Sequence, residues 1–151
     1  MLAKDIMTRD VITVSPDDRV EDVARLLVTH RISGIPVIDQ DKRILGIITE
    51  KDLVIKASEL KVPFFITLFD SIIFLENPIR FSNNLKKYTA YKVREAMTEK
   101  VATVEEDATL DEVIKIMQKK RINRVPVLRH GKLVGIISRN DILKALVKTN
   151  G

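Results

Sequence analysis

Cysteine is absent from this 151-residue sequence. The chain therefore has no disulfide bond and no thiolate to act as a nucleophile or metal ligand, and nothing in it indicates an oxidising compartment. The first ten residues, MLAKDIMTRD, are charged almost from the start and lack the apolar core of an export signal. We therefore expect a cytoplasmic protein.

The residue patterns of common catalytic and metal sites are also missing. The sequence has no Walker-type glycine loop, no dinucleotide-binding fingerprint and no histidine pair at metal-ligand spacing. Its two histidines, His30 and His130, have no consistent acid or base partner, so a surface position is the simpler interpretation for both. We expect a protein that is not an enzyme, with no catalytic residues, no metal and no catalytic cofactor.

The net charge is +5, but the basic residues are not concentrated in one stretch. They alternate with acidic segments such as SPDDRVED (15–22) and TVEEDATLDE (103–112). A nucleic-acid-binding protein gathers its lysines and arginines on one face. We interpret the charge as solvated surface and keep nucleic-acid binding only as an alternative.

The most informative feature is an internal repeat. Residues 3–38 align with residues 93–128, and after a one-residue gap residues 44–57 align with residues 133–146. MTRDVITV matches MTEKVATV, RISGIPVI matches RINRVPVL, and ILGIIT matches LVGIIS. The chain is one unit written twice, at residues 2–57 and 93–147.

Each copy shows the same order of periodicities. A short β-prone run, Val11–Val14 in the first copy, precedes apolar residues at helical spacing. Two apolar runs joined by a turn follow, and a last helix begins after Thr49 or Ser138. The stripes of the first helices are Val20, Val23, Ala24 and Leu27, and Leu110, Val113, Ile114 and Met117. The predicted unit is β-α-β-β-α, with capping boxes at Asp18 with Glu21 and at Thr109 with Glu112.

A unit of this kind, about 55 residues long, covers only one face of its sheet with helices. The simplest way to cover the other face is to pack the sheets of the two copies together. We predict an α/β (α+β) fold with pseudo-two-fold symmetry and two related clefts.

The β-α-β-β-α order, the strands GIPVI and RVPVL and the endings GIITEKD and GIISRND together resemble a tandem pair of CBS (cystathionine beta-synthase) domains, or Bateman module. The resemblance covers residues 2–57 and 93–147. It implies the sheet-paired fold and a non-catalytic regulatory role. Adenosine-containing ligands (AMP, ADP, ATP or S-adenosylmethionine) would bind in the two clefts, and their binding would be signalled to a partner protein.

The resemblance also implies that the copies share each cleft, with the early strands of one holding adenine and the T/S-x-x-D of the other holding ribose and phosphate. An aspartate at a helix start can accept both hydroxyls of a ribose, and a hydroxyl residue one turn earlier lies where free N–H groups attract phosphate. The same motif is an ordinary N-cap signature. A cap would tolerate glutamate, so the aspartate retained in both copies favours a further spatial requirement.

Carried over by residue, the resemblance implies two sites. Site A consists of Thr13, Val14, Ser33, Gly34, Ile35, Pro36, Ser138, Arg139 and Asp141, and site B of Thr103, Val104, Asn123, Arg124, Val125, Pro126, Thr49 and Asp52. Gly34 admits a base close to the backbone where site B has Arg124, and Arg139 attracts phosphate where Glu50 repels it. We predict stronger nucleotide binding at site A. A structural adaptor with degenerate clefts remains the alternative.

Residues 58–92 belong to neither copy and contain all five phenylalanines and both tyrosines. The run VPFFITLFDSIIFL (62–75) is interrupted by Asp70 and Ser71 and is too short to span a bilayer. We predict a helical insert whose apolar surface is buried within or between subunits, and hence a homodimer. Docking of an external partner is the second choice, and binding to a membrane surface is a distant one.

Overall fold

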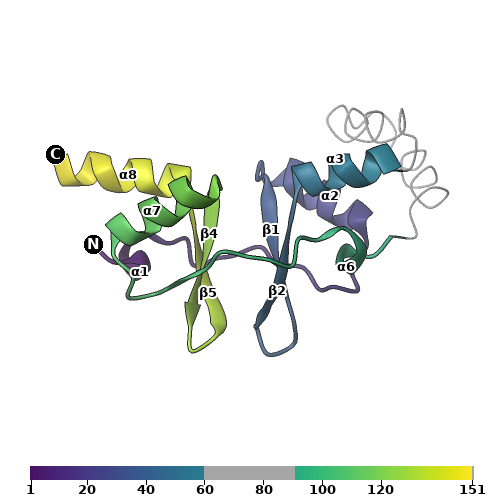
Figure 1. Ribbon diagram of the computed structural model, residues 1–151, viewed down its shortest axis with the longest axis horizontal. Coiled ribbons are helices and arrows are strands. Elements are labelled where there is room, and N and C mark those ends of the chain that lie inside the picture. Colours follow the sequence, from purple (N-terminus) through teal and green to yellow (C-terminus); the bar gives the residue numbers. More distant parts are fainter. Residues whose placement is uncertain (60–90, 151) are drawn as a thin grey trace. The chain divides into compact units, whose positions relative to one another are not determined.

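The computed structural model describes residues 1–59 and 91–150 (Figure 1). Their elements are α1 (Ala3–Ile6), α2 (Val20–Thr29), β1 (Gly34–Ile38), β2 (Ile44–Thr49), α3 (Glu50–Glu59), α6 (Val93–Ala96), β3 (Val104–Glu105), α7 (Leu110–Lys120), β4 (Arg124–Arg129), β5 (Lys132–Ser138) and α8 (Arg139–Asn150). The mixed α/β fold is as predicted. The predicted insert, apart from its ends at residues 58–59 and 91–92, lies outside the described residues.

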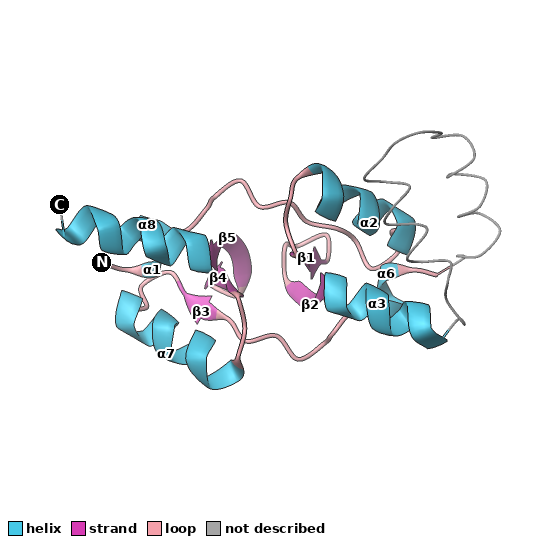
Figure 2. Cartoon of the chain, turned by 90° about the horizontal axis from the view of Figure 1, so that it is seen from above, coloured by secondary structure: helices cyan, strands magenta, loops and turns pink. Residues whose placement is uncertain are grey.

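Two small sheets are present in these ranges. β1 pairs with β2, and the second sheet has the order β3-β4-β5. β3 runs parallel to β4, and β4 runs antiparallel to β5 from the Arg124–Ser138 pair to the Arg129–Lys132 pair. α7 packs against β4 and α8 against β5, and Figures 1 and 2 show both helices on the same side of that sheet.

The first strand of the first copy is shorter than predicted. Within Val11–Val14, only Val14 forms a bridge, to Val37, and its N–H donates to the Pro36 carbonyl oxygen at 3.1 Å. Pairing does not continue beyond Val14, because a turn follows at once, in which the Asp18 N–H donates to the Ser15 carbonyl oxygen at 3.1 Å.

One of the two predicted capping boxes is correct. Thr109 Oγ1 accepts the Glu112 N–H at 3.2 Å, and the Glu112 carboxylate accepts the Thr109 N–H at 2.8 Å. The Asp18–Glu21 box is wrong, because the N-cap of α2 is Arg19, whose side chain has no acceptor. The Asp18 carboxylate lies one residue too early and accepts the Ser15 N–H instead, at 2.8 Å.

The chain forms two compact units that do not coincide with its two sequence copies. Unit 1 comprises Met1–Ile12, Ile38–Ile44 and Lys100–Gly151, and unit 2 comprises Thr13–Val37 and Leu45–Glu99. The start of each copy is therefore exchanged. The first arm, residues 1–12, belongs with the body of the second copy, and the second arm, residues 91–99, belongs with the body of the first.

Backbone hydrogen bonds hold the two arms at equivalent places. In unit 1, the N–H groups of Ala3 and Lys4 donate to the carbonyl oxygens of Ala108 and Glu106, at 2.7 and 3.0 Å. In unit 2, the equivalent donors Val93 and Arg94 bond to Asp18 and Pro16, at 2.8 and 3.1 Å. The first arm thus covers the turn that precedes α7, and the second arm covers the turn that precedes α2.

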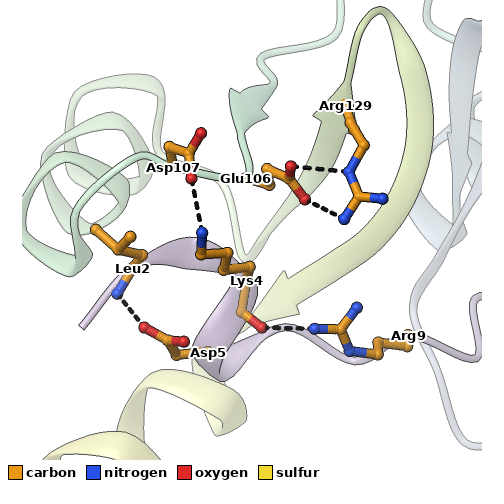
Figure 3. Close-up of polar contacts among 7 residues, drawn as sticks. All are labelled: Leu2, Lys4, Asp5, Arg9, Glu106, Asp107 and Arg129. Atoms are coloured by element: carbon orange, nitrogen blue, oxygen red, sulfur yellow. Dashed lines mark hydrogen bonds and ion pairs between the residues drawn. The ribbon is translucent and has the colours of Figure 1, made fainter.

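Ion pairs lie around the docked first arm (Figure 3). The Lys4 ammonium lies 3.0 Å from the Asp107 carboxylate, and this hydrogen bond raises the pKa of Lys4. Both guanidinium contacts of Arg129 to Glu106 are 2.8 Å, and the hydrogen bond lowers the pKa of the Glu106 carboxyl. The Lys4–Asp107 pair is solvent-exposed, and such pairs add little stability individually. Of the two pairs, only Lys4–Asp107 includes a residue of the arm.

The core of unit 1 includes side chains from the arm. Ala3 and Met7 are buried together with residues of β3, α7, β4 and β5, among them Val113, Val127 and Ile137. Burial of side chains of this kind is the main stabilising term for a small unit. The first arm is therefore part of the hydrophobic core.

The arms cross the last strand of each unit at a glycine. Thr8 and Ile136 exchange two backbone hydrogen bonds, at 2.8 and 3.0 Å, beside Gly135. A Cβ on Gly135 would lie only 2.7 Å from Met7 Cγ, and closer still to its sulfur. A Cβ on Gly46 would likewise lie 2.8 Å from the Thr98 carbonyl oxygen. The glycine of G-I-I-T/S is required by this close approach.

We expect Gly135→Ala to lower the free energy of unfolding by about 1–3 kcal/mol, because the added methyl group overpacks the contact with Met7. Urea denaturation of Gly135→Ala, Met7→Ala and the double variant measures this. Shortening Met7 removes the two nearest clashing atoms, its sulfur and Cγ, so the double variant should lose less stability than the sum of the single losses. Additive losses would contradict the assignment of Met7 as the clashing group.

Candidate functional site

The hydroxyl and the aspartate of each T/S-x-x-D motif form a reciprocal cap. At the start of α8, the Ser138 N–H and hydroxyl donate to Asp141 Oδ2 at 2.8 and 3.0 Å, and the Asp141 N–H donates back to Ser138 Oγ at 3.3 Å. At the start of α3, Thr49 and Asp52 form the same three bonds at 2.9, 3.0 and 3.2 Å. The N-cap interpretation of the motif is correct in both copies.

Each aspartate also has a partner from an exchanged arm. The Thr8 hydroxyl lies 3.2 Å from Asp141 Oδ1 and 3.4 Å from Oδ2. The Thr98 hydroxyl donates to Asp52 Oδ1 at 2.9 Å. Sequence reasoning missed both threonines as site residues, although the Met-Thr pair is retained at the start of both copies.

These contacts give a structural reason for the retained aspartate. The carboxylate must reach the residue three positions earlier with Oδ2 and the arm threonine with Oδ1. The contacts within the motif are half-buried, and the contact with the threonine is exposed. A glutamate would carry the carboxylate one methylene further out. The choice of aspartate thus has a cause that does not involve a ligand, and the predicted ligand role stays a prediction.

The strand half of site A lies in unit 2. Gly34, Ile35 and Pro36 are buried in β1, with Val14 buried beside them, while Thr13 and Ser33 are half-buried. The Ser33 carbonyl oxygen accepts the Glu50 N–H at 3.1 Å, which joins this segment to the start of α3. The backbone expected to face adenine is thus hydrogen-bonded to α3, the helix that begins within the T-x-x-D motif of the same copy.

The strand half of site B lies in unit 1 and is built in the same way. Val125 and Pro126 are buried in β4, and Val104 of β3 pairs with Val127. The Asn123 carbonyl oxygen accepts the Arg139 N–H at 3.0 Å. Asn123 is exposed, and Thr103 and Arg124 are half-buried. Arg124 takes the place of Gly34 of site A, and its half-buried side chain lies where the base is expected to bind.

The motif halves are distributed in the opposite way. Ser138, Arg139 and Asp141 of site A lie in unit 1, and Thr49 and Asp52 of site B lie in unit 2. The residues of each half lie together within a unit. That the two halves of each site combine across the units remains a prediction.

The first helical residues differ in charge between the motifs. Glu50 opens α3 and Arg139 opens α8, and both side chains are exposed. The partial positive charge of a helix N-terminus favours the glutamate and disfavours the arginine. Local helix stability therefore explains Glu50 but not Arg139.

The described ranges offer neither a metal-binding cluster nor a membrane-spanning helix. Residues 1–59 and 91–150 contain no cluster of three or more histidine, aspartate or glutamate side chains able to hold a metal ion. No helix in these ranges is both long and apolar enough to cross a membrane.

Solved structures with this fold include ligand complexes. The crystal structure of CBSX2 in complex with AMP superposes with a TM-score of 0.75 at 24% identity, covering 99% of this chain and 98% of that one. The CBS domain pair of protein MJ0100, in complex with 5′-methylthioadenosine and S-adenosyl-L-methionine, gives 0.71 at 26% identity, covering 99% and 98%.

Sequence relatives lead to the same family. An uncharacterized protein of Methanocaldococcus jannaschii is 34% identical over 155 residues, which cover 97% of this chain and 92% of the relative. The inosine-5′-monophosphate dehydrogenase of that organism is 33% identical over 143 residues, but the match spans only 23% of the enzyme's length. The family model for the CBS domain matches residues 3–59 and 93–148. The chain therefore belongs to the CBS domain family and carries two CBS domains in tandem.

Proposed function

We propose that this protein is a non-catalytic regulatory module that binds adenosine-containing ligands. The observation that carries the proposal is the capped hydroxyl–aspartate pair at the starts of α3 and α8. The proposal is supported by relatives of the same fold, which hold AMP in one case and 5′-methylthioadenosine with S-adenosylmethionine in another. The adenosine portion is common to all these ligands.

The chemistry of the pair suits a ribose phosphate. A carboxylate held at a helix start accepts charge-assisted hydrogen bonds from sugar hydroxyls, and the first N–H groups of the helix attract phosphate. In the proposed arrangement, the adenine lies against the strands of the other copy, as in the predicted sites A and B. A ligand bound in this way would bridge the two copies and bias their relative orientation, which a partner protein would detect.

We further propose that site A binds more strongly than site B. Arg139 is disfavoured by its own helix and is exposed next to Ser138, so its charge is available to a phosphate. Glu50 holds the equivalent position beside Thr49 and repels one. Half-buried Arg124 also restricts the base surface of site B.

We expect Asp141→Ala to weaken AMP binding at site A at least about tenfold, because charge-assisted hydrogen bonds to the ribose are lost. Isothermal titration calorimetry measures the affinity. Glu112→Ala is the matched control, since it removes a cap of the same spacing from α7, outside both predicted sites. Equal weakening in both variants would show that the effect comes from helix stability, and AMP binding abolished by Asp52→Ala but unaffected by Asp141→Ala would contradict the ranking.

Exchanging the charges beside the motifs should change phosphate recognition without changing base recognition. Arg139→Glu should lower the affinity for AMP more than that for adenosine, and Glu50→Arg should raise the affinity of site B for AMP. Competition titrations with AMP and adenosine at low and high salt measure the ratio. If the ratio of the affinities for AMP and adenosine were unchanged in both variants, Arg139 would not contact the phosphate.

A homodimer remains part of the proposal. On α8, Leu143 and Val147 lie one turn apart with 60% and 74% of their surfaces exposed, and α3 exposes Val54 and Ile55. Exposed apolar side chains grouped on helices are typical of subunit contacts. The predicted insert, the other candidate for the contact, lies outside the described residues.

We expect light scattering to give twice the chain mass, falling toward the chain mass on dilution. The double variant Leu143→Lys and Val147→Lys should be monomeric, because two charges would be buried in the contact. Lys144→Ala and Lys148→Ala on the same helix serve as the control. A monomeric wild type would contradict the homodimer, and a dimeric lysine variant would direct attention to residues 58–92.

A further inference from the structure

The carboxylate of Asp141 is largely occupied by groups of the protein. A carboxylate offers about four acceptor positions, two on each oxygen. Oδ2 accepts the N–H and the hydroxyl of Ser138, at 2.8 and 3.0 Å. The Thr8 hydroxyl, 3.2 Å away, takes a position on Oδ1. One acceptor position is left for a ligand.

A ribose needs more than that. Its vicinal diol donates two hydrogen bonds, so one protein hydroxyl must leave the carboxylate when both are made to Asp141. The Ser138 hydroxyl is held by bonds in both directions with a residue three positions away. The Thr8 contact joins residues 133 positions apart and is split between distances of 3.2 and 3.4 Å, near the weak end of the hydrogen-bond range. Thr8 is the partner that gives way.

We propose that Thr8 and Thr98 are specificity-determining residues that compete with the sugar hydroxyls of a ligand for Asp141 and Asp52. The inference rests on the proposed function and adds a residue to each site. Each threonine lowers the affinity for ligands with a diol and leaves ligands without one unaffected. The wild-type protein therefore prefers ligands with a ribose diol over ligands without one less strongly than a protein that lacks these threonine hydroxyls.

The competition involves the arm and not only a side chain. The Thr8 backbone is paired with Ile136 on the strand that leads to Ser138, and Thr98 is paired with Ile47 in the same way, at 2.8 and 2.9 Å. A ligand that removes the hydroxyl from Asp141 weakens one of the contacts that hold the first arm on unit 1. By linkage, any partner whose binding loosens the arm would also raise the affinity for the ligand.

The two copies differ in the strength of the competitor. Thr98 lies 2.9 Å from Asp52 Oδ1, closer than Thr8 lies to Asp141. A ligand at Asp52 therefore displaces the stronger hydrogen bond. This difference acts in the same direction as the charges of Arg139 and Glu50, and it favours the site that contains Asp141.

The test is calorimetric titration of the full chain with AMP and with 2′,3′-dideoxyadenosine 5′-monophosphate, which lacks the diol. An Asp52→Ala background restricts the measurement to the Asp141 site. In this background, Thr8→Val should tighten AMP binding about two- to tenfold, the equivalent of one ordinary hydrogen bond, and leave binding of the dideoxy compound unchanged. Valine keeps the branched shape of threonine, and Thr8→Ser restores the hydroxyl and the weaker affinity.

The outcomes separate the two proposals. Weaker AMP binding by Thr8→Val, unchanged AMP binding, or an equal change for both compounds would overturn the competition. Thr98→Val in an Asp141→Ala background repeats the test at the other site, and tightening of AMP is expected there too. If the wild-type chain bound no adenosine compound at all, the proposed function itself would be contradicted, and this inference with it.

Discussion

The exchange of the two arms is the interaction on which the rest of the structure depends. It is made by pairs of backbone hydrogen bonds, Thr8 with Ile136 and Thr98 with Ile47, each next to a glycine that lets a methionine of the arm approach the strand. The same docking places Met7 in the core of unit 1. A single side-chain atom on Gly135 would oppose the docking of Met7, because the space is already filled.

The exchange also connects helix capping with recognition. Asp141 caps α8 through Ser138 and contacts the first arm through Thr8, and in the proposed function it accepts a sugar as well. One carboxylate cannot fully satisfy all these donors at once. A ligand that takes up part of its capacity must therefore affect the arm, which is the kind of differential contact that a regulatory module needs. The coupling proposed here would require no large movement, only the loss of one hydrogen bond.

The two copies keep the same frame but differ at the places where a ligand would make contact. Both have the reciprocal cap, the arm threonine and the buried strand proline. They differ in Gly34 against Arg124, in Arg139 against Glu50, and in the distance from the threonine to the aspartate. Because the frame is shared, these differences provide matched pairs in which one copy serves as the control for the other.

The sequence by itself determined the α-β-β-α order that both copies share, the Thr109 cap and the helix starts after Thr49 and Ser138, because each depends on residues within a few positions of one another. The first strand of the predicted unit forms only in the second copy, as β3. It misplaced the cap of α2, since the competing turn at Ser15 is not visible in a spacing pattern. Only the tertiary structure decided that each copy begins in the other copy's unit and that Thr8 reaches Asp141. Contacts between residues so far apart depend on how the chain closes upon itself, which no local periodicity encodes.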